Sequence, residues 1–156
     1  MRWPKFLLLT LGILGVGWLL DHLFHLEENR VLGRIETAAL AIERKDFEGL
    51  SACLREDFHF DSRSPFLGGG DLSQARSRLE DFWSRSGTLS VIWRSSEVRV
   101  ENRLATVQAK GNLKFVGGEM GEFAFYQFQA DLKLEKQTTD WKIYHVEIPV
   151  LAPWSF

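Results

Sequence analysis

The spacing of hydrophobic and polar positions changes twice along the chain. Residues 6–20 carry no charge and are apolar at nearly every position. Over residues 28–43 apolar side chains recur every three or four positions, which predicts an amphipathic helix. No Pro- or Gly-rich linker separates this helix from the apolar run, so we expect the helix to continue the run almost directly. From residue 89 onward the spacing becomes two, which predicts strands.

Between these regions the sequence predicts two shorter helices and a strand. Asp46 is placed to cap a helix that runs through Leu50 and Leu54, and Asp71 is placed to cap another. The second of these has one apolar face, made of Leu72, Ala75, Leu79, Phe82 and Trp83. Phe58 and Phe60 alternate with polar residues and predict the strand. Pro and Gly residues in 64–70 predict a loop.

Four strand segments follow, joined by short polar or Gly turns. They cover residues 89–100 (with a bulge expected near Ser95 and Ser96), 105–115, 126–135 and 141–148. Helices therefore come first and neighbouring antiparallel strands come last. This order predicts an α+β class rather than alternating βαβ units. A chain of 156 residues leaves room for one such domain, over residues 26–148.

The N-terminal run has the features of a signal anchor. A short basic segment precedes it, and it meets Asp21 and His22 without a small-residue cleavage site. A buried helix of a soluble protein is the alternative, but a helix that is apolar on every side needs protein all round it. We therefore expect residues 1–25 to form a single transmembrane helix. Arg2 and Lys5 predict a cytoplasmic N-terminus, which puts the domain on the periplasmic side of a bacterial-type inner membrane.

Composition and motifs exclude several functions. The formal net charge is −2 and no basic stripe occurs, so a nucleic-acid partner is not predicted. Cys53 is the only cysteine, which rules out an internal disulfide and a metal site built on paired cysteines. Residues 68–70 are Gly-Gly-Gly, but no Lys-Ser or Lys-Thr follows, so they form no P-loop. No cofactor is predicted.

Three segments in this order resemble the nuclear-transport-factor-2-like superfamily, including its SnoaL-like and ketosteroid-isomerase-like members. They are Leu54-Arg-Glu-Asp-Phe-His-Phe60, Leu79-Glu-Asp-Phe82 and Trp141-Lys-Ile-Tyr-His145. The resemblance covers residues 28–148. It implies a curved antiparallel sheet wrapped around about three helices, in the shape of a cone with an apolar cavity. The superfamily contains isomerases, cyclases and ligand-free adaptor domains.

Catalytic residues of the isomerases do not carry over onto this chain. By the resemblance the catalytic Asp falls at Ser62, while Asp61 is one position away and on the opposite face of its strand. Many relatives place a second His two positions after the first on the last strand, where this chain has Glu147. No catalytic residue is therefore predicted, and the chain is expected to be a non-enzyme.

Four residues are candidates for lining a cavity: His145, Glu147, Trp93 and Tyr126. His145 shares strand parity with Trp141 and Ile143, so it could act as a base oriented by Glu147, or it could be a core histidine with its hydrogen bonds satisfied. His22, His25 and Glu28 share a helix face, but a polar collar beside the membrane explains them better than a metal does. No metal site is predicted.

The last segment, residues 149–156, is an apolar tail. Pro149 and Pro153 lack backbone donors, so the tail is expected to leave the sheet. Trp154 and Phe156 are candidates for contact with a partner or a membrane, or for closing the cone.

Two functions fit these features. The first is a membrane-anchored, non-catalytic interaction or assembly module, such as a subunit of a membrane complex, whose partners are membrane lipid and a protein or a second copy of the chain. The second is a small-molecule-binding protein, or an isomerase- or cyclase-like enzyme, that uses the cone cavity.

Overall fold

The structure is a computed structural model that describes residues 3–63, 68–119 and 124–153, without the side chains of residues 3–9 and 24. Within these ranges the chain forms three helices and six strands. In chain order they are α1 (Trp3–Glu43), α2 (Phe47–Ser51), β1 (Leu54–Ser62), β2 (Gly70–Asp71), α3 (Leu72–Arg85), β3 (Ser86–Glu101), β4 (Leu104–Gly118), β5 (Ala124–Gln137) and β6 (Asp140–Pro153).

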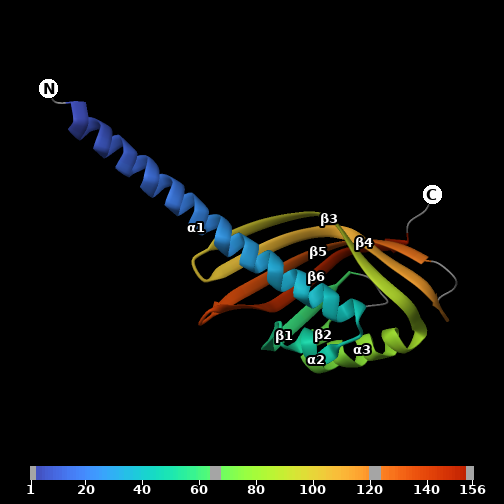
Figure 1. The fold of residues 1–156 in the computed structure, drawn as a ribbon. Coiled ribbons are helices and arrows are strands. Elements are labelled where there is room, and N and C mark those ends of the chain that lie inside the picture. The colour runs from blue at the N-terminus through green and yellow to red at the C-terminus, as the bar shows by residue number, and fades with distance from the viewer. Residues whose placement is uncertain (1–2, 64–67, 120–123, 154–156) are drawn as a thin grey trace.

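All six strands form one sheet with the order β2-β1-β6-β5-β4-β3. The strands β3 to β6 pair antiparallel with their chain neighbours, whereas β1 lies parallel to β6. Figure 1 shows the curved sheet with the second half of α1, α2 and α3 beside it. The α+β prediction is confirmed. The expectation of a wholly antiparallel sheet is wrong for β1, because β1 and β6 are joined by most of the chain and no short turn fixes their direction.

Both predicted helix caps are confirmed, although the helix expected to run through Leu54 ends at Ser51, and Leu54 begins β1. The Asp46 carboxylate accepts a hydrogen bond from the Gly49 amide at 2.9 Å, and α2 starts at the next residue. Asp71 forms a capping box with Gln74: its carboxylate accepts from the Gln74 amide, and the Gln74 side chain accepts from the Asp71 amide. Each cap satisfies amides that a helix start leaves without partners.

The core lies between the helices and one face of the sheet, which we call the inner face. The second half of α1 contributes Val31, Ile35, Ala38 and Ala41 at helical spacing. The sheet contributes Ala105, Val107 and Ala109 from β4, Ala130, Leu132 and Leu134 from β5, and Trp141 and Ile143 from β6. Buried small residues alternate with exposed residues along the first half of β4, so the predicted alternation of this strand is confirmed.

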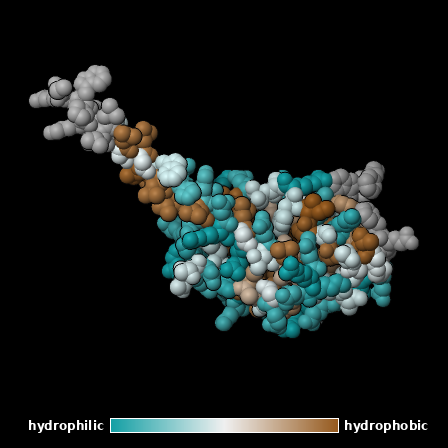
Figure 2. All heavy atoms as spheres, in the orientation of Figure 1, coloured by the Kyte–Doolittle hydropathy of each residue, from teal (hydrophilic) through white to brown (hydrophobic). Residues whose placement is uncertain are grey.

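The first half of α1 projects away from the domain (Figure 1). Apolar side chains at least half exposed follow one another along it: Leu11, Ile13, Leu14, Val16, Trp18, Leu19 and Leu20. Figure 2 shows them as a mostly apolar stalk beside a largely polar domain surface. Among the described residues, however, no helix reaches the length and hydropathy of a membrane span. The predicted transmembrane anchor over residues 1–25 is therefore not supported by the structure, whose description leaves out residues 1–2 and the side chains of residues 3–9 and 24.

The C-terminal segment stays in the sheet as far as it is described. Val150, Leu151, Ala152 and Pro153 pair with Gln129, Phe128, Gln127 and Tyr126 of β5. The prediction that residues after 148 leave the sheet is wrong for this part. Pro149 is tolerated because the β5–β6 register shifts at this point, and a missing amide donor does not interrupt a regular ladder there. Trp154 and Phe156 lie outside the described residues.

Candidate functional site

The inner face at the β3–β5 end is filled by aromatic rings. Two of the predicted pocket residues are here. Tyr126 packs edge-on against Phe115, and Trp93 packs edge-on against Phe128, each with ring centroids 5.6 Å apart. Phe128 lies over Gly111, where a Cβ atom would come within 2.7 Å of its ring. Tyr126 and Trp93 therefore take part in aromatic packing, and Trp93 lies at the exposed rim of it.

His145 and Glu147 lie on the opposite face of the sheet, which we call the outer face. Leu134 pairs with Ile143, whereas the preceding Lys133 pairs with His145, so Tyr144 is an extra residue in β6. A bulge of one residue exchanges the faces of all side chains that follow it. After the bulge Val146 and Ile148 pack on the core, and His145 and Glu147 face away from it. The prediction that these two line a cavity with Trp141 is wrong for this reason.

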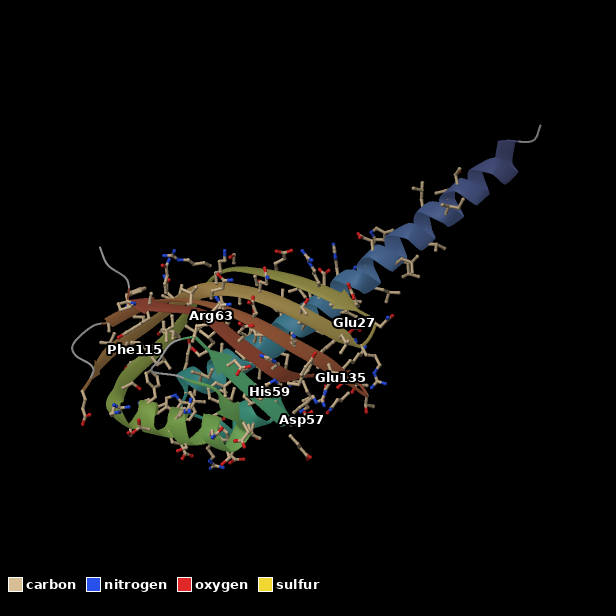
Figure 3. The ribbon with its side chains drawn as sticks, turned by 180° about the vertical axis from the view of Figure 1, so that it is seen from behind. Glu27, Asp57, His59, Arg63, Phe115 and Glu135 are labelled. Atoms are coloured by element: carbon tan, nitrogen blue, oxygen red, sulfur yellow. The ribbon has the colours of Figure 1, made fainter. Side chains whose placement is uncertain are left out.

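The structure brings His145 beside two residues of β1. His59 is its register partner across the parallel β1–β6 pair, and Asp61 follows two positions later on the same face of β1. The two imidazole rings have centroids 4.2 Å apart, and the Asp61 Oδ2 lies 3.4 Å from His145 Nε2. One potential ligand atom from each of the three residues lies within 4.8 Å of the other two. Figure 3 labels His59 on β1.

The electrostatics of this cluster favour a neutral His145. Burial lowers the pKa of its imidazole, and the nearby His59 and Lys133 lower it further, while Asp61 and Glu147 act in the opposite sense. Its Nε2 is buried and makes no hydrogen bond, although Asp61 is near. A neutral imidazole nitrogen with no proton partner is able to accept a proton or bind a metal ion.

Ser62, the position that the resemblance assigned to the catalytic Asp, donates its hydroxyl to the Ile148 carbonyl at 3.4 Å. Asp61 faces outward, as its strand parity predicted. Among the described residues, the positions named by the resemblance thus bring no carboxylate to the inner face.

An open cleft of about 300 Å³ lies between α1 and the turn from β5 to β6. It is lined by Arg30, Gly33, Arg34, Thr37, Thr139, Asp140 and Trp141. Its charges are largely compensated, since Arg34 pairs with Asp140 at 3.5 Å and Arg30 pairs with Glu27 at 3.0 Å. Sequence reasoning did not predict this cleft, because the turn and the helix meet only in the folded chain.

Glu27 fastens α1 to the β5–β6 hairpin beside this cleft (Figure 3). Its carboxylate accepts hydrogen bonds from Lys136 Nζ at 2.9 Å and from Trp141 Nε1 at 3.0 Å. The hydrogen bond from Lys136 is the largest of the effects that hold the pKa of Glu27 below its usual range, while burial opposes them. Both oxygens of the Glu27 carboxylate accept hydrogen bonds in this way, so the role of Glu27 is to hold α1 against the β5–β6 hairpin.

The three residues His22, His25 and Glu28 of α1 do not come together in one cluster. His25 and Glu28 are 3.7 Å apart on α1, and His22 stacks on Trp18 instead. The cluster of His59, Asp61 and His145 was missed. The sequence signal for this cluster is His-x-Asp within an alternating strand, which puts both side chains on one face. No nearby residue in the sequence indicates that His145 joins them.

The domain has the nuclear-transport-factor-2-like α+β fold, with six strands in a curved sheet and helices beside it. No protein-family model matches the sequence, and no curated protein matches it. Solved structures with this fold do match. A conserved protein from Planctomyces limnophilus has a TM-score of 0.75 at 13% identity, over 83% of this chain and 99% of that one.

A putative scytalone dehydratase from Novosphingobium aromaticivorans has a TM-score of 0.72 at 14% identity, over 84% of this chain and 89% of that one. A nuclear transport factor 2-like superfamily protein from Salmonella enterica has a TM-score of 0.70 at 13% identity, over 81% and 91% of the two chains. Identities this low establish the fold alone, and function has to be argued from the residues of this chain.

Proposed function

We propose that this chain is a non-catalytic interaction module that is attached to a membrane by its N-terminal helix. The observation that carries the proposal is the projecting half of α1, where the exposed side chains of Leu14, Val16 and Leu19 point to different sides of the helix. Water does not stabilise a helix that is apolar all round, and one globular partner covers only part of its circumference. A lipid bilayer covers every side.

The backbone extent of the projecting half of α1 supports this proposal. From Trp3 to Leu23 a continuous α-helix extends about 30 Å, which is the thickness of the hydrocarbon layer. The same helix continues into the core through Val31 and Ile35 without a break. A membrane-inserted first half would hold the domain close to the bilayer, on the periplasmic side if Arg2 and Lys5 stay in the cytoplasm.

The interior of the domain supports a role other than catalysis. Tyr126 and Trp93 pack among aromatic rings, and the titratable cluster with His145 is on the other face of the sheet. Some proteins of this fold have enzyme names, such as the putative scytalone dehydratase. An isomerase-like enzyme or a small-molecule-binding protein is the competing function, but it would require an acid or base that faces the inside of the cone.

The membrane proposal is tested by washing membranes with alkaline carbonate. We expect the full-length chain to remain in the membrane fraction with its N-terminus uncleaved. The double variant Leu11→Arg/Leu14→Arg should be released, because two charges in the middle of the span are costly. Leu40→Arg is the matched control, since Leu40 is 46% exposed on the part of the same helix that packs on the domain. Release of the wild-type chain, or equal release of the control, would exclude the anchor.

The non-catalytic proposal is tested by complementation of a deletion strain. Tyr126→Phe and Ser62→Ala keep the shape of the inner face, and each removes one hydroxyl group from it. We expect both variants to restore the wild-type phenotype at normal protein levels. A folded, normally abundant variant that fails to do so would favour the enzyme.

A further inference from the structure

His59, Asp61 and His145 are brought together by two features of the sheet. The spacing of two in β1 places His59 and Asp61 on the outer face, and the bulge at Tyr144 turns His145 onto the same face. The β1–β6 register then sets His145 directly opposite His59. Without the bulge, His145 would point into the core and the three side chains could not meet.

The distances suit a single small cation. The three ligand atoms lie within 4.8 Å of one another, and one pair, His145 Nε2 and Asp61 Oδ2, is 3.4 Å apart. Two ligand atoms that each lie about 2.0–2.1 Å from a tetrahedral zinc ion are separated by roughly 3.4 Å. The same two atoms make no hydrogen bond with each other, so neither ligand atom is committed to the other.

We propose that His59, Asp61 and His145 bind a divalent transition-metal ion, with zinc as the ion whose ligand preferences fit best. Two imidazoles and one carboxylate are typical zinc ligands, whereas magnesium and calcium prefer oxygen ligands alone. Three protein ligands leave one tetrahedral position for water. Glu147, which is opposite Asp61 in the register, adds negative charge beside the site.

The bound ion would join β1 to β6 next to an irregular part of their pairing. The two strands pair in parallel, and their register shifts between Leu54 and His59. A metal ion held by both strands stabilises the folded chain, and more so the tighter it binds. The reason is that the unfolded chain does not hold the three ligands together. Lys133 pairs with His145 across β5 and β6, and its positive charge repels a bound cation.

The test is a zinc titration of the full-length chain in mild detergent, without a polyhistidine tag and after treatment with a chelator. We expect one zinc ion per chain with micromolar or tighter affinity, and a melting temperature that rises by several degrees with zinc and not with magnesium. Cobalt should bind at the same place and give a visible absorption spectrum. His59→Ala and Asp61→Asn, both at exposed positions, should each weaken zinc binding at least about tenfold.

Matched variants separate this site from other ligands on the chain. His25→Ala removes a histidine that pairs with Glu28 on α1, and Asp57→Asn removes a carboxylate that Arg55 holds on β1; neither should change zinc binding. Lys133→Gln should tighten it. The proposal is overturned if the wild-type chain binds no zinc at millimolar concentration, or if the double variant His59→Ala/Asp61→Asn still binds one ion with unchanged affinity.

Discussion

The inner and outer faces of the sheet carry different kinds of side chains. The inner face buries Leu134, Trp141 and Ile143 almost completely, and rings pack against one another toward the β3–β5 end. The outer face at β1 and β6 carries charged and titratable groups, among them Arg55, Asp57 and the cluster around His145. Both faces are built from the same strands, and one extra residue at Tyr144 decides to which face His145 belongs.

This difference suggests that the inner face provides most of the stability and that the outer face is free to bind ligands. Removing apolar surface from water is the main favourable contribution to folding, so the inner face is expected to determine the free energy of unfolding. Exposed ion pairs contribute little to stability, which leaves the outer face free to bind. Substitutions on the two faces should therefore change the free energy of unfolding by very different amounts.

Trp141→Ala should have the largest effect. Trp141 is 2% exposed, and its indole Nε1 also donates to Glu27, so the substitution leaves a cavity and a carboxylate with one partner fewer. We expect the free energy of unfolding to fall by about 3–5 kcal/mol, as measured by denaturant titration.

Trp93→Ala is the control on the same face, because Trp93 is 37% exposed at the rim. Its effect should be less than half as large. Equal effects at the two positions would show that burial on the inner face does not determine stability.

The sequence predicted what depends on local spacing. The faces of the helices, the caps at Asp46 and Asp71, and the strand alternation of residues 105–115 all follow from neighbours within a few positions. The bulge expected near Ser95 is also present, between Trp93 and Ser95. Two serines between apolar stretches marked that position.

The outer-face cluster could not be predicted because it depends on pairing between distant segments. Residues Ile143, Tyr144 and His145 contain no Gly or Pro that would mark a bulge, so parity alone placed His145 with Trp141. The parallel pairing of β1 with β6 is likewise fixed by the folded sheet rather than by a turn. The resemblance gave the fold, but it could not show on which face this histidine lies.

Glu27→Gln should have an intermediate effect that depends on pH. The carboxylate joins the helix to the inner-face residue Trp141 and to Lys136, and its pKa is lowered mainly by the hydrogen bond from Lys136. A carboxyl with a lowered folded-state pKa stabilises the fold above its ordinary pKa of 4.5, and this contribution is lost as the pH falls through the lower, folded value.

At pH 7 we expect the Glu27→Gln substitution to cost about 1–2 kcal/mol, as is usual for hydrogen bonds to a charged group. Below the folded-state pKa the variant and the wild type should have nearly the same stability. Denaturant titrations at neutral and acid pH measure the difference, and a difference that does not depend on pH would contradict this role of the charge.

Asp71→Ala should have a smaller effect, because it removes only the cap of α3. The Gln74 amide loses its acceptor, while α3 still packs through Ala75 and Trp83. We expect a loss of about 1 kcal/mol in the free energy of unfolding. Asp71→Asn is the matched variant and should retain most of the stability, since an Asn side chain also accepts the Gln74 amide proton. Equal losses in the two variants would show that the negative charge, and not the hydrogen bond, is what matters.

Asp57→Asn should have the smallest effect, although Asp57 makes two short contacts. Its carboxylate accepts from Arg55 at 2.7 and 2.6 Å, but its side chain is 64% exposed to water. Arg55 also pairs with Glu135 of β5 and lies over the Tyr144 ring, so it keeps partners when Asp57 is neutral. Because exposed ion pairs contribute at most about 1 kcal/mol, we expect a change below roughly 0.5 kcal/mol, measured by denaturant titration at low and high salt. A loss as large as that of Asp71→Ala would show that ion pairs on the outer face stabilise the fold, and the division of roles between the two faces would then be wrong.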